Sequence, residues 1–206
     1  VTGRGSGTMR LDLHVHTRER SNCSQSSAEE MIAAAKRIGL DGIAVTDHEK
    51  RVPPDELEDL NRRHAPFRIF RGIERNVVED VVVLGLADPE LETIPDYAGL
   101  VRFARERGGF VVLPHPYRYS DSVRLPVDET PPDAIELHSI HTGSCDEAAV
   151  RALIGRVGAR AIVTSDAHHA DNIGLFHIEL ERRVETDADL VAELKRGAYA
   201  FRSRPD

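Results

Sequence analysis

Histidine and acidic residues occur close together in the first apolar segment of the chain, residues 10–16. Asp12, His14 and His16 alternate there with three aliphatic residues. Because side chains alternate between the two faces of a strand, the three polar side chains would share one face. Imidazole and carboxylate groups that converge in this way are ligands for divalent metal ions such as zinc, manganese or iron. We therefore expect this segment to open a metal site.

Five later apolar segments end in the same residue types. They lead to the pair Asp47 and His48, to Glu74, to His115, to His138, and to the pair Asp166 and His168. The carboxyl ends of the strands in a parallel barrel meet at one face, so these side chains are expected to converge. Burying several imidazoles and carboxylates together without a cation is unfavourable, because like charges and unpaired polar groups both oppose it. The pattern predicts a centre with more than one metal ion.

Strand-like and helical segments alternate along most of the chain. The strand-like runs are 10–16, 41–47, 67–74, 79–86, 109–115, 133–139, 159–166 and 175–180, and helices are expected at 27–39, 54–64, 96–107, 146–157 and 187–196. Such alternation is typical of parallel strands joined by helical crossovers, in a barrel or an open wound sheet. The short link between 67–74 and 79–86 predicts a local hairpin. Residues 118–132 form the longest irregular loop, and loops of this length are often functional.

Composition and charge narrow the class of protein. The 206 residues fit one domain, expected over 10–206 after a flexible, Gly-rich tail at 1–9. The 27 basic and 35 acidic residues give a net charge of −8, which argues against nucleic acid as a partner. No apolar run has the length of a membrane span, and we find no secretory signal. Cys23 and Cys145 form no CxxC pair, so we expect a cytoplasmic protein.

Several of these segments, taken in order, resemble a known family. "DLHVHT", "GLDGIAVTDH", "GIE", "LPHPYR" and "VTSDAH" are similar to the signature of the PHP (polymerase and histidinol phosphatase) family. The resemblance extends from Arg10 to about Phe201. It implies an α/β fold, a distorted barrel of seven βα units, with a two- or three-metal centre that hydrolyses phosphate esters.

The resemblance also implies which residues hold each ion. The first ion would be bound by His14, His16 and Asp166. The second would be bound by His115 and His138, with Glu74 bridging two ions. The third would be bound by His48 and His168. His141 stays open as an alternative to His138, which we prefer. Cys23 or Glu19 would be a further ligand of the third ion, and Cys23 could equally be a small buried residue.

The expected reaction is hydrolysis of a small phosphomonoester by a metal-activated hydroxide. Neutralising a phosphate also calls for guanidinium groups, and Arg118 is the best placed to take part in catalysis. Arg18, Arg20 and Lys50 follow ligand residues and are expected to bind the substrate. Asp47 would orient a ligand histidine, a common role of carboxylates beside metal sites, or would donate a proton.

A different class of function is a non-catalytic metal- or nucleotide-binding regulatory module with the same fold. Such a module would be expected to have lost ligands, and this chain retains nearly all of them. Within the family that the chain resembles, substrates also include nucleoside phosphates and DNA ends, and a protein phosphotyrosine stays open as well. The acidic net charge makes the DNA-processing reading the weaker one.

Overall fold

The computed structural model describes residues 7–142 and 147–204. Within this part the chain forms nine strands and five α-helices. The strands are β1 (Met9–Val15), β2 (Gly42–Val45), β3 (Arg68–Asn76), β4 (Asp80–Leu84), β5 (Phe110–Leu113), β6 (Ala134–His138), β7 (Arg160–Val163), β8 (Phe176–Leu180) and β9 (Tyr199–Ser203). The α-helices are α1 (Ala28–Arg37), α2 (Pro54–His64), α3 (Tyr97–Glu106), α4 (Glu147–Val157) and α5 (Asp187–Arg196), and two short 3-10 helices are η1 (Pro89–Glu92) and η2 (Ala170–Asn172). Cys145 and Asp146, the expected first residue of the fourth helix, lie outside the described residues.

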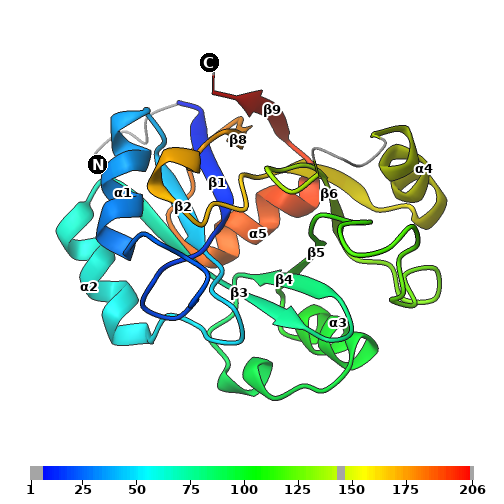
Figure 1. The fold of residues 1–206 in the computed structure, drawn as a ribbon. Helices are drawn as coiled ribbons and strands as arrows, with labels where there is room; N and C mark the ends of the chain where they lie inside the picture. Colours follow the sequence, from blue (N-terminus) through cyan, green and yellow to red (C-terminus); the bar gives the residue numbers. More distant parts are fainter. Residues whose placement is uncertain (1–6, 143–146, 205–206) are drawn as a thin grey trace.

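All nine strands belong to one sheet, in the order β7-β6-β5-β4-β3-β2-β1-β8-β9 (Figure 1). The pairs β1/β2, β2/β3, β5/β6 and β6/β7 are parallel. The predicted hairpin is present as β3 and β4, and it makes the β3/β4 and β4/β5 pairs antiparallel. β8 runs antiparallel to both β1 and β9.

The sheet curls until its two ends nearly meet. Val15 at the end of β1 forms a parallel bridge with Ala167, which follows β7. The backbone N–H of His16 donates to the carbonyl of Ala167 at 2.9 Å, and the N–H of Ala167 donates to the backbone carbonyl of His14 at 3.1 Å. On β9, the Tyr199 hydroxyl donates to the carbonyl of Ala161 at 2.9 Å. The expected distorted α/β barrel is therefore confirmed, and the antiparallel strands are what distort it.

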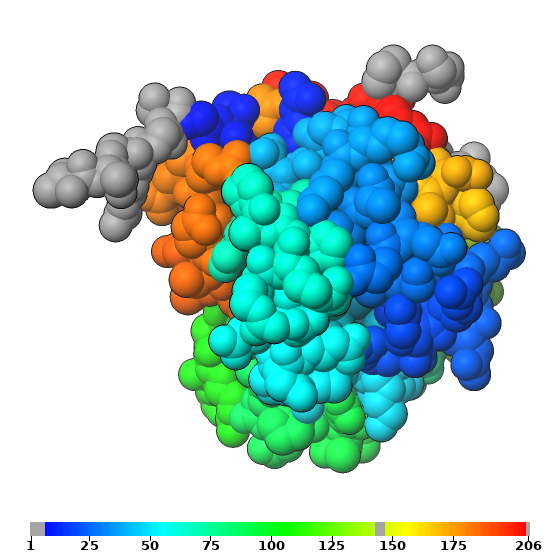
Figure 2. Space-filling model, turned by 90° about the vertical axis from the view of Figure 1, so that its left-hand side faces the viewer, coloured from blue at the N-terminus to red at the C-terminus, as the bar shows by residue number. Residues whose placement is uncertain are grey.

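The helices begin and end at residues suited to those positions. Ser27 accepts a hydrogen bond from Glu30 N–H, and the Glu30 carboxylate accepts one from Ser27 N–H at 2.7 Å, so α1 starts with a capping box. α5 begins after Thr186 and ends at Gly197, whose φ of 71° is left-handed. α1 and α2 lie side by side over β2 and β3 and form the face seen in Figure 2. An ion pair between Arg63 and Glu29 joins the two helices.

Aliphatic side chains fill the inside of the barrel beneath the carboxyl ends of the strands. Leu13, Val82, Leu84, Val112 and Ile162 surround this interior, and all are at most 3% exposed. Burial of apolar surface is the main favourable term in folding, so this filling gives the strand ends a rigid base. The polar side chains at the strand ends are held in place by that base.

Two features depart from the sequence expectations. Met9, assigned to the tail, is the fully buried first residue of β1. β9 was not expected, because most of its residues are exposed and it lacks an apolar face. The loop after β5 has no helix or strand from 114 to 133, as expected for its irregular core at 118–132. Among the described helices, none combines the length and apolarity that crossing a bilayer requires.

Candidate metal centre

The histidines and carboxylates predicted at separate strand ends, except His138, meet at one end of the barrel. His14, His16, Glu74, His115 and Asp166 are each at most 4% exposed. The Nε2 atom of His14 lies 3.3 Å from Glu74 Oε1 and 3.3 Å from Asp166 Oδ1. His115 Nε2 lies 3.3 Å from the same Glu74 oxygen. The structure therefore brings together residues that are up to 152 positions apart, from His14 to Asp166.

The first group of ligand atoms comes from His14, His16 and Asp166. The two Nε2 atoms of the histidines are 3.1 Å apart. On the far side of each ring, His14 Nδ1 lies 3.3 Å from Glu136 Oε1, and His16 Nδ1 lies 3.3 Å from Ser21 Oγ. Because a carboxylate only accepts, Nδ1 of His14 carries the proton and its Nε2 presents a lone pair to the centre.

The same argument holds for His16 through Ser21 and Asp47. The Ser21 hydroxyl donates to Asp47 Oδ1 at 2.8 Å, so its oxygen accepts from His16 Nδ1. Asp47 also accepts from the Thr17 backbone N–H and hydroxyl. Two Nε2 lone pairs therefore face each other, an arrangement that a shared cation stabilises. Orienting carboxylates of this kind are typical of metal-bound histidines.

Two carboxylate oxygens in the centre support the same interpretation. Glu74 Oε2 and Asp166 Oδ1 are buried and accept no hydrogen bond from any described residue. Histidine nitrogens nevertheless lie nearby, at 2.9 Å from the first oxygen (His48 Nδ1) and 3.2 Å from the second (His16 Nε2). Buried polar atoms in proteins nearly always have a partner. The donor set and these two oxygens thus fit divalent cations well.

A second group consists of Glu74, Asp80 and His115. Asp80 was not predicted, because the predicted ligands all end strands and Asp80 is the first residue of one. β4 runs antiparallel to β3, and Asp80 pairs with Asn76 just beyond Glu74. The first residue of β4 consequently lies at the same end of the barrel as the last residues of β3. The predicted hairpin contained this signal.

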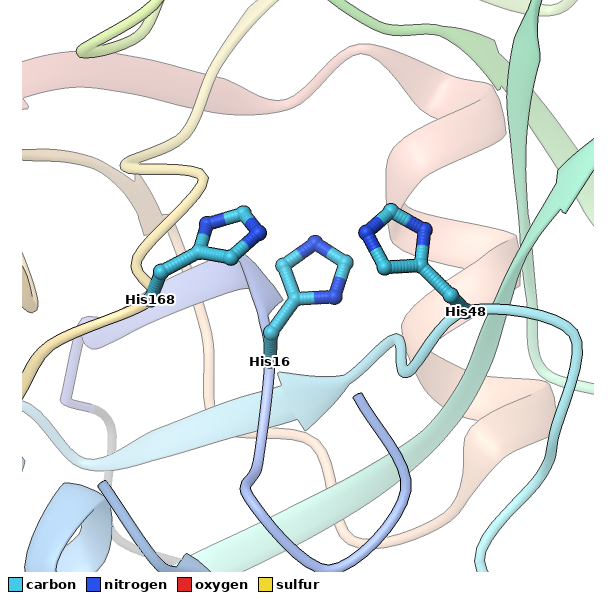
Figure 3. A group of neighbouring side chains, drawn as sticks. All are labelled: His16, His48 and His168. Carbon is cyan, nitrogen blue, oxygen red and sulfur yellow. The ribbon is translucent and has the colours of Figure 1, made fainter. Parts of the chain in front are cut away.

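A third group is formed by His16, His48 and His168, whose rings face one another in Figure 3. The ring centroids of His48 and His168 lie 4.4 Å and 4.2 Å from that of His16. The three side chains come from the end of β1, the loop after β2 and the loop after β7. His168 Nδ1 donates to the carbonyl of Asp166 at 3.0 Å, which leaves its Nε2 for a ligand.

The structure places His138 and His141 differently from the stated preference. The His138 ring stacks on Phe176 at 5.7 Å and lies 3.4 Å from Glu147, away from the three groups. His141 Nε2 lies 3.5 Å from Asp166 Oδ2, and His141 forms a further group with Asp166 and His168. A register irregularity in β6 between residues 136 and 138 breaks the simple alternation on which the preference rested. This placement favours His141 and not His138 as a ligand.

Glu136 is a buried residue of the centre that was not predicted to have a role. Its carboxylate accepts from the Thr164 hydroxyl, from His115 N–H at 2.8 Å and from His14 Nδ1. Asp12 has a similar position on β1, where it accepts from the backbone N–H groups of Ser165 and Gly174. Both carboxylates fix the backbone or rings that carry the ligands.

Burial and neighbouring charges oppose one another in the pKa values of the centre. Burial lowers the pKa of His14, but Asp166 and Glu74 outweigh it, and without a bound cation the net pKa lies well above 6.5, so an ion at Nε2 would take the place of that proton. Burial raises the pKa of Glu74, but the histidines outweigh it and hold the pKa well below 4.5. Burial lowers the pKa of His16 to about 4, so its ring is neutral at neutral pH. The buried carboxylates are therefore stabilised by positive charge close to them, which bound divalent ions would supply.

The other predicted residues lie at varied distances from the centre. Arg118 Nη1 is 3.5 Å from Asp166 Oδ2, inside the site. Arg18 lies near Glu30, Arg20 is paired with Glu56, and the exposed Lys50 lies 3.4 Å from Glu92. The Glu19 carboxylate accepts from Ala28 N–H at the start of α1. Cys23 is exposed and belongs to none of the ligand groups among the described residues.

Two curated proteins are similar to part of the chain. DNA polymerase III PolC-type from Streptococcus pyogenes is 30% identical over 94 residues, which are 46% of this chain and 6% of that protein. A "Probable phosphatase" from Caldicellulosiruptor saccharolyticus is 32% identical over 78 residues, which are 34% of this chain and 32% of that protein. The chain therefore matches less than a third of the length of each relative.

Solved structures share the fold at low sequence identity. A two-domain protein from Bacteroides vulgatus, containing a "predicted PHP-like metal-dependent phosphoesterase", aligns with a TM-score of 0.69 at 18% identity, over 98% of this chain and 69% of its own. PsfC from Pseudomonas syringae aligns at 0.66 and 19% identity, over 90% and 88%. The lesion-specific endonuclease EndoQ from Pyrococcus furiosus aligns at 0.65 and 15% identity, over 95% and 58%.

The family is shown by sequence models. A model described as PHP-associated matches residues 149–199. The model of the PHP domain matches residues 12–124, more than half of the chain and the part that holds His14, His16, His48, Glu74 and His115. This chain belongs to the PHP domain family.

Proposed function

We propose that this protein is a metal-dependent phosphoesterase that hydrolyses a small phosphomonoester with two or three zinc, manganese or iron ions. The observation that carries the proposal is the convergence of two lone-pair nitrogens with two buried carboxylate oxygens that accept no hydrogen bond from the described residues. The names of the Bacteroides and Caldicellulosiruptor relatives support a phosphoesterase. The site would work in a reducing cytoplasm, in keeping with its free thiol at Cys23.

The two oxygens of Glu74 face different histidines, so this carboxylate would contribute to holding more than one ion. Its Oε1 faces His14 and His115, each at 3.3 Å, and its Oε2 faces His48 at 2.9 Å. The two oxygens of Asp166 also face different histidines: Oδ1 faces His14 and Oδ2 faces His141. In this proposal His14, His16 and Asp166 would hold the first ion. Glu74, Asp80, His115 and His141 would hold the second, and His48 and His168 would hold the third.

Divalent ions bound there would act as Lewis acids on phosphoryl oxygens and lower the pKa of a water molecule. The chain itself supplies Arg118, whose guanidinium borders Asp166 and is placed to bind a phosphoryl oxygen. Asp47 is fully engaged by Thr17 and Ser21, so we assign it the orientation of His16 and no proton transfer. Arg20 is held by Glu56, which leaves Arg18 and Lys50 as the exposed cations of the predicted substrate-binding set.

A hydrolysis assay with metal analysis tests this function. The purified chain would be dialysed, its metal content measured, and a panel of phosphomonoesters and phosphodiesters offered with added Mn²⁺, Zn²⁺ or Fe²⁺. We expect two or three ions per chain and turnover of a monoester that the His14→Ala variant loses. His169→Ala is the matched control, because His169 neighbours a ligand but has a half-exposed side chain and lies outside the ligand groups.

The alternative outcomes separate the classes of function. Bound ions without hydrolysis of any ester would indicate the non-catalytic binding module. Hydrolysis of diesters alone would move the substrate towards nucleic acid, as the names of the EndoQ and PolC relatives suggest for those proteins. Hydrolysis that survives in His14→Ala at the wild-type rate would contradict the proposed site.

A further inference from the structure

Tyr119 is an exposed aromatic residue at the rim of the metal centre. Its relative exposure is 58%. In the described part of the chain only two other large hydrophobic residues, Val78 and Phe201, are exposed. Tyr119 follows Arg118 in the irregular loop between β5 and β6. A large exposed aromatic surface beside a functional site is a common feature of ligand recognition.

Three contacts hold the Tyr119 side chain in place. Its hydroxyl donates to Asp80 Oδ2 at 3.2 Å, and the Arg118 guanidinium lies 5.2 Å from the centre of its ring. The ring also meets the His115 ring edge-on, with centroids 6.2 Å apart at 83°. The phenol is therefore anchored at its polar end and beside its ring, yet much of its surface stays open to solvent.

Arg118 connects this ring to the ligand groups. Its Nη1 lies 3.5 Å from Asp166 Oδ2, while the same guanidinium borders Tyr119. A phosphoryl group bound by Arg118 beside Asp166 would have its organic substituent close to the Tyr119 ring. An aromatic ring offers a flat surface with little conformational entropy to lose on binding.

We infer that Tyr119 selects phosphate esters whose organic part carries a flat aromatic ring, which stacks on the Tyr119 side chain. This inference rests on the proposed function and narrows its substrate class. Stacking of a flat ring on an aromatic side chain changes affinity by about tenfold, and it depends on the ring and not on the hydroxyl. The selectivity should therefore survive Tyr119→Phe and disappear in Tyr119→Ala.

Two small phosphonates test the inference without requiring turnover. Phenylphosphonate and methylphosphonate carry the same phosphoryl group and differ in the ring. Their dissociation constants would be measured by calorimetry on the Mn²⁺-loaded full chain and its variants. We expect wild type and Tyr119→Phe to prefer phenylphosphonate by about tenfold, and Tyr119→Ala to lose most of that preference. Phe201→Ala, which removes an exposed aromatic on β9, should keep it.

The outcomes distinguish this inference from the function on which it rests. Equal preference in wild type and Tyr119→Ala would overturn the role of the ring while leaving phosphoryl binding intact. Loss of preference in both Tyr119→Phe and Tyr119→Ala would also overturn it, because the hydroxyl would then be responsible. If neither phosphonate bound the Mn²⁺-loaded wild type, the proposed function itself would fail, and the inference with it.

Discussion

The Nε2 atoms of His14 and His16 lie 3.1 Å apart, while the opposite nitrogen of each ring donates a hydrogen bond to a side chain. Each ring is therefore fixed in the tautomer that presents a lone pair to its neighbour. The partners that fix them, Glu136 and Ser21, come from β6 and from the loop after β1. A cation bound between the two rings, as proposed, would stabilise this close approach.

Replacing Glu136 with Gln should weaken metal binding and lower stability. The amide has one oxygen in place of two, so its N–H₂ group would face a donor, either His14 Nδ1 or the His115 N–H. We expect metal affinity to fall by about 10- to 100-fold and the free energy of unfolding by about 1–3 kcal/mol. Metal titration and denaturant unfolding would check this, with the exposed Glu147→Gln as control. Identical metal affinity in the two variants would contradict the role of Glu136.

Glu49 should be needed to hold His48 in the centre. Its carboxylate accepts from Arg75 Nε at 2.7 Å and from Asn76 N–H at 2.6 Å, which ties the turn after β2 to β3. Its backbone has a φ of 60°, in the left-handed region. In Glu49→Ala we expect the third ion, assigned to His48 and His168, to be lost during dialysis while the others stay bound, as measured by elemental analysis. The exposed Glu58→Ala on α2 should retain the wild-type content, and equal losses in both would refute the idea.

His141 and His138 should respond differently to substitution. His141→Ala removes a nitrogen 3.5 Å from Asp166, whereas His138→Ala removes a ring stacked on Phe176. We expect kcat/KM for a phosphomonoester to fall by more than about tenfold in His141→Ala and to change little in His138→Ala. Steady-state kinetics on both variants decides the point. The reverse order of effects would restore His138 as the ligand.

Tyr199 should make the folded state sensitive to high pH. Burial raises its pKa to about 12, above the ordinary value of 10, so the folded chain favours the neutral phenol that donates to Ala161. The stability it contributes is fully present below pH 10, its unfolded pKa, and is lost as the pH rises towards 12. Unfolding by denaturant at a series of alkaline pH values would show this loss. Tyr199→Phe should show a shallower decline, and an unchanged slope would argue against the contribution.

Much of the fold follows from patterns of burial that the sequence displays. The eight expected strand-like runs correspond to β1–β8, because buried strands in a barrel are almost continuously apolar. Helix boundaries follow capping residues such as Ser27, Asp96 and Gly197. β9 has mostly exposed residues and therefore carries no such pattern. The antiparallel placement of β8 depends on tertiary packing and not on its own sequence.

The site could be anticipated only where a ligand type ended a predicted strand. That rule locates His14, Glu74, His115 and Asp166, which the structure brings together. It misses Asp80, which begins an antiparallel strand. It also selects His138 at the end of β6, which lies away from the ligand groups. The register irregularity after Glu136 breaks the regular alternation of side chains there, so His138 does not point where the pattern predicts.

Anomalous diffraction from crystals soaked in Mn²⁺ would show whether the converging ligands bind a metal ion. We expect a strong peak between the Nε2 atoms of His14 and His16, in contact with Asp166 Oδ1 and about 2.0–2.3 Å from each atom. A His14→Ala crystal should lose that peak. An anomalous map with no density between the two nitrogens, in a wild-type crystal whose rings keep these positions, would contradict the account.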